Sequence, residues 1–349
     1  MKINKRMHTL KKYVVSKRVS DPKLKKLDWN ECSVEIDDDL NKFFMHCLQE
    51  IKFSEYPEIK NKKLLKKIAE YCDIDQQNIE VFNGSDSALK YIFEVFVDED
   101  ISVLVFNPNY SQINTYIRMQ TNKLYFSDIQ DIFGQHKYNF DDIENHDVVY
   151  ISNPNNPTGH VLLPSTIEKI VKENPKKMFI VDEAYYEFCK LSCVELIKKY
   201  DNLIVTRTFS KAFGLASARL GYMCSSVKNI NIVNKIKNHK EVNSFAQNLG
   251  IVALNNIDMI EKRVNKVNKN KNAFCYDLKK NNIEYVDSKS NFVLLKTKKH
   301  KTVLKQLLEN NILVRDRSYM DNLESCIRVT IGEQKDMDKI IEILESNNE

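Results

Sequence analysis

Glycine is scarce in this sequence, and the few glycines present point to particular segments. The chain has 349 residues and only seven glycines, about 2% where globular proteins average ~7%. A chain with so little glycine should keep it where the backbone needs a positive φ or a close approach. Four of the seven lie in "FNGSDSAL" (82–89), "SNPNNPTGH" (152–160) and "RTFSKAFGLASARLGY" (207–222). These segments are therefore the first candidates for a functional site.

Long apolar runs and paired cysteine motifs are also absent. No run approaches the ~18 residues needed to cross a bilayer, and charges stand where a signal peptide would have an apolar stretch. We therefore expect a cytoplasmic protein with no membrane partner. The eight cysteines include no C-x-x-C, and Cys189 and Cys193 have no histidine at metal-site spacing. We expect no metal site and free thiols in a reducing compartment.

Charge of one sign is not in large excess over the whole chain. There are 53 basic and 48 acidic residues, a net charge of +5, which gives no reason to expect a nucleic-acid partner. The first 26 residues are more basic, with one acid, Asp21, and ten basic residues: Lys2, Lys5, Arg6, Lys11, Lys12, Lys17, Arg18, Lys23, Lys25 and Lys26. They could form an arm for an anionic partner, although a solvated arm in a lysine-rich protein is the preferred interpretation.

Short apolar runs are present and recur along the chain. They lie at 101–106, 147–152, 177–182, 202–208 and 220–225. The runs are β-branched, continuous and mostly widely spaced, which predicts a buried, mainly parallel sheet with helices on both faces. The last two runs are too close for a crossover helix, so 220–225 is predicted to be antiparallel.

Helical patterns fill the intervals between these runs. Segments 61–72 and 85–96 have apolar residues at helical spacing. From about residue 236 a Lys/Asn-rich helical stretch is followed by predicted strands at 291–297 and 311–317 and by a final helix. The pattern predicts an α/β protein with a smaller α+β domain at its C-terminus.

One acidic residue ends a fully apolar strand. Asp182 would lie at the carboxyl edge of the sheet, where ligands bind in open α/β folds. A partly dehydrated carboxylate there would pair with a cation or a protonated ring nitrogen, and Tyr185 could point into the same cleft. The alternative is an aspartate that caps the next helix.

Two of the glycine segments offer ligand-binding geometry. Gly84 and Ser85 stand where a loop becomes a helix, and the exposed N–H groups of a helix start attract anions. An ordinary N-cap has the same sequence pattern. Pro154 and Pro157 bracket Asn155 and Asn156 in a rigid turn that could hold an asparagine side chain over a ligand, although a purely structural turn is the competing interpretation.

Lys211 follows a predicted strand at the same edge, where burying an amine costs free energy. Lysine is the side chain that forms imines with carbonyl compounds. Ser210 beside it and Arg219 eight residues on could both reach a phosphate. Together with Asp182, these residues suit a ligand with an aldehyde, a phosphate and a ring nitrogen, and pyridoxal 5′-phosphate (PLP) has all three.

The motifs "SNPNNPTG", "VDEAYYEF" and "RTFSKAFGLASARLGY", in this order, resemble those of fold-type-I PLP-dependent aminotransferases. The histidinol-phosphate aminotransferase branch is the most similar, and the resemblance runs from about Leu27 to Gln334. It implies an α/β fold with a mainly parallel seven-stranded sheet flanked by helices. It also implies a large PLP-binding domain at 40–235, and a smaller domain in which an N-terminal arm (1–39) joins residues 236–349.

The resemblance implies a role for each residue at a matching position. Lys211 would bond to the cofactor aldehyde, and Asp182 would pair with the ring nitrogen. Tyr185 and Asn156 would hydrogen-bond the ring oxygen, and Tyr110 would stack on the ring. The residues implied around the cofactor phosphate are Gly84, Ser85, Asp86, Ser210 and Arg219.

Four further residues are implied to act on the substrate or across a subunit boundary. Arg315 and Arg328 match arginines that bind the anionic end of the substrate, and Asn30 matches a residue of the substrate-covering arm. Tyr56 matches a tyrosine that reaches a neighbouring subunit's cofactor phosphate. The resemblance therefore implies a homodimer with shared active sites.

The substrates follow from the same resemblance, which implies glutamate as amino donor and a small phosphorylated keto compound as acceptor. The arm segment "LDWNECS" keeps Asn30 and Glu31, but Trp29 is inserted and the asparagine and proline usual after them are missing. The acceptor stays open between imidazole acetol phosphate, the partner of histidinol phosphate, and a three-carbon acetol phosphate without the imidazole.

Two other functions remain open on the sequence alone. Close relatives of this branch decarboxylate phosphorylated amino acids of the phosphoserine or threonine phosphate type, and the sequence does not show which Cα bond is held for cleavage. A non-enzymatic regulator built on this fold would need a DNA-binding domain. Only about 40 residues precede the large domain, without a helix-turn-helix pattern.

Overall fold

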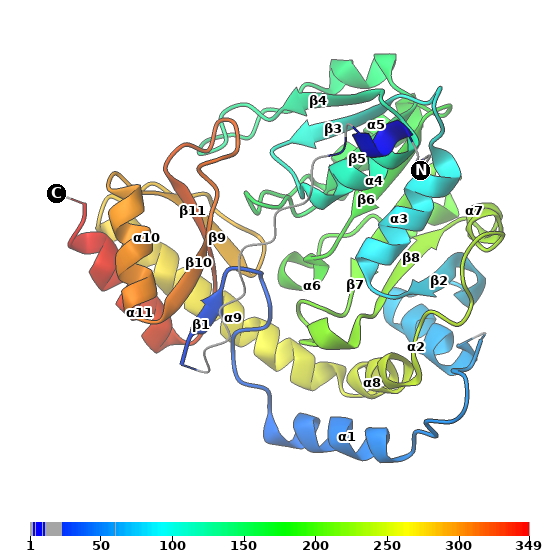
Figure 1. Cartoon of the computed structure of the whole chain (residues 1–349), viewed down its shortest axis with the longest axis horizontal. Helices are drawn as coiled ribbons and strands as arrows, with labels where there is room; N and C mark the ends of the chain where they lie inside the picture. Colours follow the sequence, from blue (N-terminus) through cyan, green and yellow to red (C-terminus); the bar gives the residue numbers. More distant parts are fainter. Residues whose placement is uncertain (1–2, 4, 9, 11–22, 60, 349) are drawn as a thin grey trace.

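Figure 1 shows a computed structural model of the chain, which describes residues 3, 5–8, 10, 23–59 and 61–348. Two β-sheets stand side by side, and the long helix α9 (Ile257–Lys280) runs from the smaller sheet toward the larger one. Part of the basic N-terminal segment lies outside the described residues, namely Lys2, Lys11, Lys12, Lys17 and Arg18.

The larger sheet has seven strands in the order β2-β8-β7-β6-β5-β3-β4. Its strands are β2 (Ile79–Phe82), β3 (Val103–Asn107), β4 (Leu124–Asp128), β5 (Val148–Ser152), β6 (Met178–Asp182), β7 (Leu203–Thr208) and β8 (Gly221–Ser225). Every pairing is parallel except the two that β8 makes with β2 and β7. The five predicted strands and the antiparallel direction of 220–225 are therefore confirmed. β2 and β4 were not predicted.

The central strands are apolar without interruption because both of their faces are buried. Val149 and Val181 pack into one hydrophobic core, while their chain neighbours Tyr150 and Ile180 pack into the other. Alternation of side chains across a pleated strand makes this division necessary. The helices of this region are α2 (Lys62–Cys72), α3 (Ser85–Phe96), α4 (Gln112–Gln120), α5 (Pro164–Glu173), α6 (Tyr186–Cys189) and α7 (Val227–Val233). The two helices predicted at 61–72 and 85–96 are confirmed.

The smaller sheet has four strands in the order β1-β10-β11-β9. They are β1 (Lys25–Leu27), β9 (Phe292–Lys296), β10 (Ile312–Asp316) and β11 (Cys326–Thr330). β1 pairs in parallel with β10, with Lys25 opposite Ile312, so the N-terminal arm completes a sheet formed by the C-terminal part of the chain. The predicted strands at 291–297 and 311–317 and the final helix are confirmed, whereas β1 and β11 were not predicted.

The remaining helices surround or connect the two sheets. They are α1 (Asp38–Gln49), α8 (Ser244–Asn255), α10 (His300–Glu309) and α11 (Gln334–Glu345). Short 3-10 turns are η1 (Lys5–His8), η2 (Gln76–Asn78), η3 (Phe140–Asn145), η4 (Val194–Lys198) and η5 (Ala216–Ala218).

For the domains, we propose the division that the sequence predicts, with 40–235 as one unit and 1–39 with 236–349 as the other. This division keeps each sheet whole. Helix α8 of the second unit packs on α1 and α2, so the two units share an interface beyond the covalent connections.

Candidate active site

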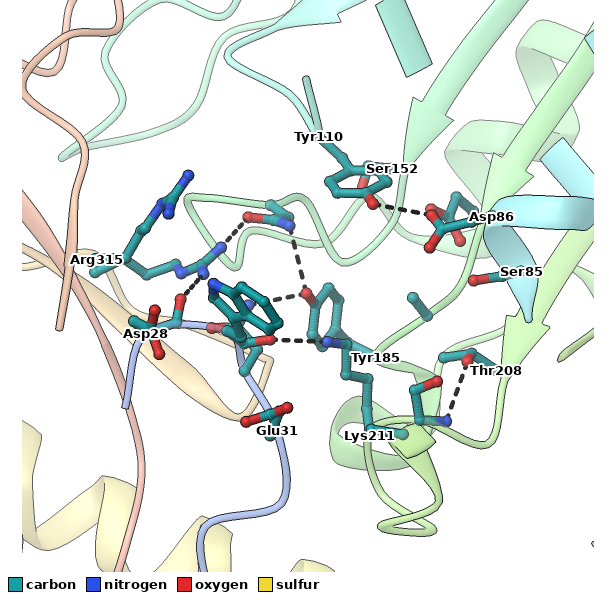
Figure 2. A pocket seen from close by; sticks show the side chains of 18 of the residues that line it. Asp28, Glu31, Ser85, Asp86, Tyr110, Ser152, Tyr185, Thr208, Lys211 and Arg315 are labelled. Atoms are coloured by element: carbon teal, nitrogen blue, oxygen red, sulfur yellow. Dashed lines mark hydrogen bonds between the residues drawn. The ribbon is translucent and has the colours of Figure 1, made fainter. Parts of the chain in front are cut away.

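Side chains from both sheets line one cavity of about 520 Å³ (Figure 2). Ser152, Asp182 and Thr208 end three neighbouring parallel strands, β5, β6 and β7, so the sheet brings them to one edge. The lining residues are Asp28, Trp29, Asn30, Glu31, Ser85, Asp86, Tyr110, Ser111, Ser152, Asn156, Asp182, Ala184, Tyr185, Thr208, Ser210, Lys211, Ala216, Ser217, Arg219, Arg315, Arg317 and Arg328. The volume falls in the range of small-molecule sites.

Asp182 is buried at the floor of this cavity. Its Oδ2 accepts a hydrogen bond from the Tyr150 hydroxyl at 3.0 Å, and its Oδ1 accepts one from Thr206 Oγ1 at 3.1 Å. Burial raises the pKa of Asp182 to about 6, against the two hydrogen bonds, which lower it. A carboxylate in this position gains most from a cationic partner, such as a protonated ring nitrogen, because the charge then remains paired.

Lys211 lies in the loop that follows β7, and it is held by the N-terminal arm. Its Nζ donates a hydrogen bond to the backbone carbonyl of Trp29 at 2.9 Å. The pKa of Lys211 is lowered to about 8, mainly by burial and secondly by the positive charge of Arg328. About one-tenth of the amine is therefore neutral at pH 7, and a neutral amine can attack a carbonyl or accept a proton.

One side of the cavity combines the start of a helix with a guanidinium group. Gly84, with φ +85°, is the N-cap of α3, and a Cβ there would lie 2.6 Å from Arg219 Nη2. A Cβ at Gly221 would lie 2.3 Å from the backbone nitrogen of Ser85. Glycine at position 84 therefore lets the Arg219 guanidinium approach the start of α3, and glycine at position 221 lets strand β8 approach it. Arg219, the start of α3 and Ser210 form a cradle of cationic and N–H donors that suits a phosphate.

Asp86 connects this cradle to an aromatic ring. Its Oδ2 accepts from Arg219 Nη2 at 3.3 Å, and its Oδ1 accepts from the Tyr110 hydroxyl at 2.9 Å. Figure 2 shows the bond between Tyr110 and Asp86. The carboxylate therefore orients Arg219 and fixes the Tyr110 ring at the cavity wall.

Tyr185 lies at the centre of a second hydrogen-bonded group. Its hydroxyl accepts from Asn30 Nδ2 at 2.9 Å and from Asn156 Nδ2 at 3.4 Å. Arg328 donates through Nη1 to Asn156 Oδ1 and through Nη2 to the Asp28 carbonyl oxygen at 2.6 Å. The arm, the proline-rich turn and β11 thus meet at one tyrosine.

The structure brings together all but one of the residues that the sequence assigns to the site. Gly84 supports the cavity wall through its contact with Arg219, and the other assigned residues line the cavity itself. Tyr56 is the exception, because its side chain is 78% exposed and does not line the cavity. Its ring lies against Lys240, whose Nζ is 4.1 Å from the ring centroid.

Sequence reasoning missed several residues of the site. Trp29 and Asp28 belong to the arm, whose course no local pattern predicts. Arg317 lies two positions after Arg315, and the twofold alternation of an extended strand places such residues on one face. Tyr150 precedes Ser152 by two positions on β5, but the buried hydroxyl–carboxylate bond to Asp182 depends on strand order, which the sequence does not give.

Three groups of residues around the cavity can be compared with the three reactive parts of PLP. A glycine-lined phosphate cradle, a buried carboxylate with a raised pKa and a lysine with a lowered pKa lie around the same space. They match the phosphate, the ring nitrogen and the aldehyde of the cofactor in turn. The residues present fit the group.

No helix in the described part of the chain is long and apolar enough to cross a membrane. Within the same residues, no group of three or more His, Cys, Asp or Glu side chains is arranged to hold a metal ion.

Comparison with known proteins gives consistent matches over most of the chain. The profile of the family described as "Aminotransferase class I and II" matches residues 25–344. A histidinol-phosphate aminotransferase of Clostridium novyi is 34% identical over 331 residues, covering 93% of this chain and 91% of that protein. A dihydroxyacetone phosphate transaminase of Campylobacter jejuni is 33% identical over 340 residues, covering 93% and 90%.

A solved structure matches the fold. It is the histidinol-phosphate aminotransferase of Sinorhizobium meliloti in complex with pyridoxal-5′-phosphate, with a TM-score of 0.83 and 22% identity. The match covers 93% of this chain and 91% of that one. The α/β fold with a mainly parallel seven-stranded sheet and a second, smaller sheet, expected from the sequence, is confirmed.

Proposed function

The chain belongs to the aminotransferase class I and II family and is a PLP-dependent aminotransferase, and from that premise we propose that it moves an amino group from glutamate to a small phosphorylated keto compound. One observation carries the proposal. Lys211, with its lowered pKa, lies in a cavity with a phosphate cradle on one side and a group of arginines on the other. The first suits the cofactor phosphate and the second suits the anionic end of a substrate.

When bound, PLP supplies an aldehyde that condenses with amines and a ring that takes up electron density from the substrate Cα. Ser85, Ser210 and Arg219 would hold its phosphate, with Gly84 giving the backbone room. Tyr110 would stack on the ring.

The buried side chains of the cavity would set the protonation states. Asp182 would hold the proton on the ring nitrogen, because an ionised carboxylate in a buried site favours a cation beside it. Tyr185 and Asn156 would hydrogen-bond the ring oxygen. Lys211 Nζ, when free and neutral, would accept the proton that leaves the substrate Cα.

Two features support a compact, anionic acceptor. Arg315 and Arg328 lie opposite each other in the β10–β11 register, so two guanidinium groups can meet one phosphate or carboxylate. Trp29, a large side chain, forms part of the cavity wall beside Lys211. That wall favours a three-carbon acetol phosphate of the dihydroxyacetone phosphate type over imidazole acetol phosphate, because the ring of the latter must share the same space.

The assembly we propose is a homodimer. The segment from α1 to α2 exposes large apolar side chains, including Met45 at 60%, Phe53 at 82% and Tyr56 at 78%. Exposed apolar side chains gathered in one segment are typical of a protein–protein interface. In a second copy packed on this segment, Tyr56 would reach the partner's cofactor phosphate.

The test of the function separates the two half-reactions. Glutamate is added to the holoenzyme, and the absorbance change from the aldehyde form to the amine form is followed. Dihydroxyacetone phosphate or imidazole acetol phosphate is then added to the amine form. We expect both acceptors to restore the aldehyde spectrum. The kcat/KM should be about tenfold or more higher for dihydroxyacetone phosphate than for imidazole acetol phosphate.

Two variants at position 29 test the size argument. Trp29→Ala should reduce the ratio of kcat/KM between the two acceptors, and Trp29→Phe should leave that ratio unchanged. A wild-type preference for imidazole acetol phosphate would show the three-carbon assignment to be wrong. Release of carbon dioxide from phosphoserine or threonine phosphate, without conversion by glutamate, would replace transamination with decarboxylation.

A further inference from the structure

The cavity side that faces away from the phosphate cradle carries three arginines, Arg315, Arg317 and Arg328. In Figure 2, Arg315 and Asp28 lie on the opposite side of Tyr185 from Ser85 and Asp86. Arg315 and Arg328 already have roles in substrate binding under the proposed function. Arg317 has none, although it is 7% exposed and lines the same cavity.

Short-range contacts fix the backbone and side chain of Arg317. Its backbone N–H donates to the Cys326 carbonyl oxygen at 3.0 Å, and its own carbonyl accepts from the Met320 N–H at 3.0 Å. Its Nη1 donates to the Tyr319 hydroxyl at 2.9 Å. The guanidinium is therefore oriented at the cavity wall, where less of its conformational entropy is lost when an anion binds.

The three arginines do not share the same position along the cavity. Arg328 is tied to Asn156 and to the Asp28 carbonyl beside Tyr185, close to the reacting end of a substrate. Arg317 follows β10 and is oriented by Tyr319, which is 62% exposed. Arg317 and Arg328 are therefore held by different parts of the chain, and Arg317 can meet the distal group of a substrate whose reacting end lies beside Tyr185.

The charges at this side of the cavity favour an anion with two charges. Two carboxylates, Asp28 and Glu31, line the cavity with the three arginines. Burial raises the pKa of Asp28. A carboxyl group that is less readily ionised neutralises less of the positive charge of the arginines. Burial, followed by the charges of Arg317 and others, lowers the pKa of Arg328 to about 9. A phosphate dianion placed among these groups would reduce the mutual repulsion of the cations more than a carboxylate would.

We propose that Arg317 binds the distal phosphate of the acceptor and gives the enzyme its preference for a phosphate dianion over a carboxylate, with Tyr319 as its positioning residue. This inference rests on the proposed function and makes its substrate class specific. Glutamate, whose distal group carries one charge, depends on Arg317 less than the phosphorylated acceptor does.

The experiment compares Arg317→Gln with wild-type holoenzyme in the two half-reactions, measured separately by stopped-flow absorbance. We expect KM for dihydroxyacetone phosphate to rise about 10- to 100-fold, the range of a lost charged hydrogen bond, with kcat little changed. The glutamate half-reaction should change less than about threefold. Arg317→Lys should restore part of the loss, and Tyr319→Phe should raise the same KM a few-fold without lowering kcat.

Arg118→Gln is the matched control, because Arg118 is an exposed arginine on α4 outside the cavity. It should leave both half-reactions unchanged. An equal loss in both half-reactions of Arg317→Gln, or no loss in either, would overturn the inference. Should Arg317→Gln fail to fold, the same comparison with Arg317→Lys decides.

A binding measurement separates this inference from the proposed function. Trp29 is the only tryptophan of the chain and lines the cavity, so its fluorescence reports on anions added to the holoenzyme. We expect inorganic phosphate to bind wild type about tenfold or more tightly than Arg317→Gln. If wild type uses no phosphorylated carbonyl compound, the proposed function fails, while equal phosphate affinity in the two proteins refutes the role of Arg317.

Discussion

The two sides of the cavity are assembled in different ways. The phosphate-cradle side comes from strand ends and loops of one sheet, where Asp182 ends β6 and Ser210 and Lys211 follow its neighbour β7. The arginine side joins the N-terminal arm to the C-terminal sheet, and the bond between Arg328 and the Asp28 carbonyl spans 300 positions of sequence.

Under the proposed function, this difference in construction corresponds to a difference in task. The cradle side would meet the cofactor, which is the same in every turnover. The arginine side would meet the substrates, which differ between the two half-reactions. Substitutions on the first side should therefore affect all substrates alike, whereas substitutions on the second should discriminate among them.

Lys211→Ala is the strongest test of the cradle side. Removal of the amine takes away both the covalent attachment and the proton acceptor, so both half-reactions should slow by about 10⁴-fold or more. Borohydride treatment followed by mass spectrometry should show cofactor fixed to the wild-type chain and none on the variant. Equal labelling of the two proteins would show that another amine is used.

Asp182→Asn should have the next largest effect. Loss of a buried charge partner costs about 3–5 kcal/mol, so both half-reactions should slow by about 10²- to 10³-fold in steady-state and stopped-flow assays. Asp182→Glu, which keeps the charge, should be less severe. An effect confined to one substrate would contradict the division between the two sides.

The same substitution should stabilise the apoenzyme. Burial raises the pKa of Asp182 to about 6 from 3.8, so the folded state binds this proton more tightly than the unfolded state. Stability is then lost as pH rises from about 4 to 6, by about 3 kcal/mol in total. Asp182→Asn removes this loss. In urea unfolding at pH 8, the apoprotein of the variant should therefore have a higher free energy of unfolding than wild type. At pH 3 the two proteins should have the same free energy of unfolding.

Arg328→Lys tests the arginine side. A lysine keeps the charge but cannot bond to both Asn156 and Asp28 in the planar geometry of a guanidinium. We expect kcat/KM for glutamate to fall about 10- to 100-fold, with the cofactor still bound and its spectrum retained. Loss of cofactor from the purified variant would show that the two sides are less independent than their construction indicates.

The pH dependence of the acceptor half-reaction links the two sides, because Lys211 responds to Arg328. With a pKa of about 8 for Lys211, the neutral amine fraction rises about tenfold between pH 7 and 9. The rate should rise with it and level off above pH 9. Since Arg328 is the second cause of the lowered pKa, Arg328→Gln should move the midpoint upward, and an unchanged midpoint would assign the shift to burial alone.

Tyr56→Phe should have the smallest effect. It removes one hydroxyl from a residue that we place at the partner's cofactor phosphate, so the cofactor affinity should fall only a few-fold. Equilibrium dialysis with PLP measures this, and sedimentation at several protein concentrations should show a dimer for both proteins. A monomeric wild type would remove the basis for the role of Tyr56.

The sequence predicted the cradle side far better than the arginine side, for a physical reason. Strands buried on both faces leave continuous apolar runs, and the polar residues that end them must meet at one sheet edge. Asp182 and Lys211 could be placed in this way, and family resemblance added Tyr110 and Asn156. Short strands such as β2, with four residues, leave too little pattern to be recognised.

The arginine side depends on pairings between distant segments. β1 has three residues and exists as a strand because β10 is available to pair with it. No local pattern in the sequence encodes the place of Trp29 or of Arg317 in the cavity wall. Arg315 and Arg328 were assigned through resemblance, since their own surroundings in the sequence give no sign of burial.

The parallel pairing of β1 with β10 also orders events during synthesis on the ribosome. The residues of the arm are made before the larger sheet, but the strand they pair with is made after every strand of that sheet. The nascent chain can complete its larger sheet before that point, because domains form as their own residues become available. A chain that stops before residue 312 therefore lacks β10 and β11, and with them the three arginines of the substrate side.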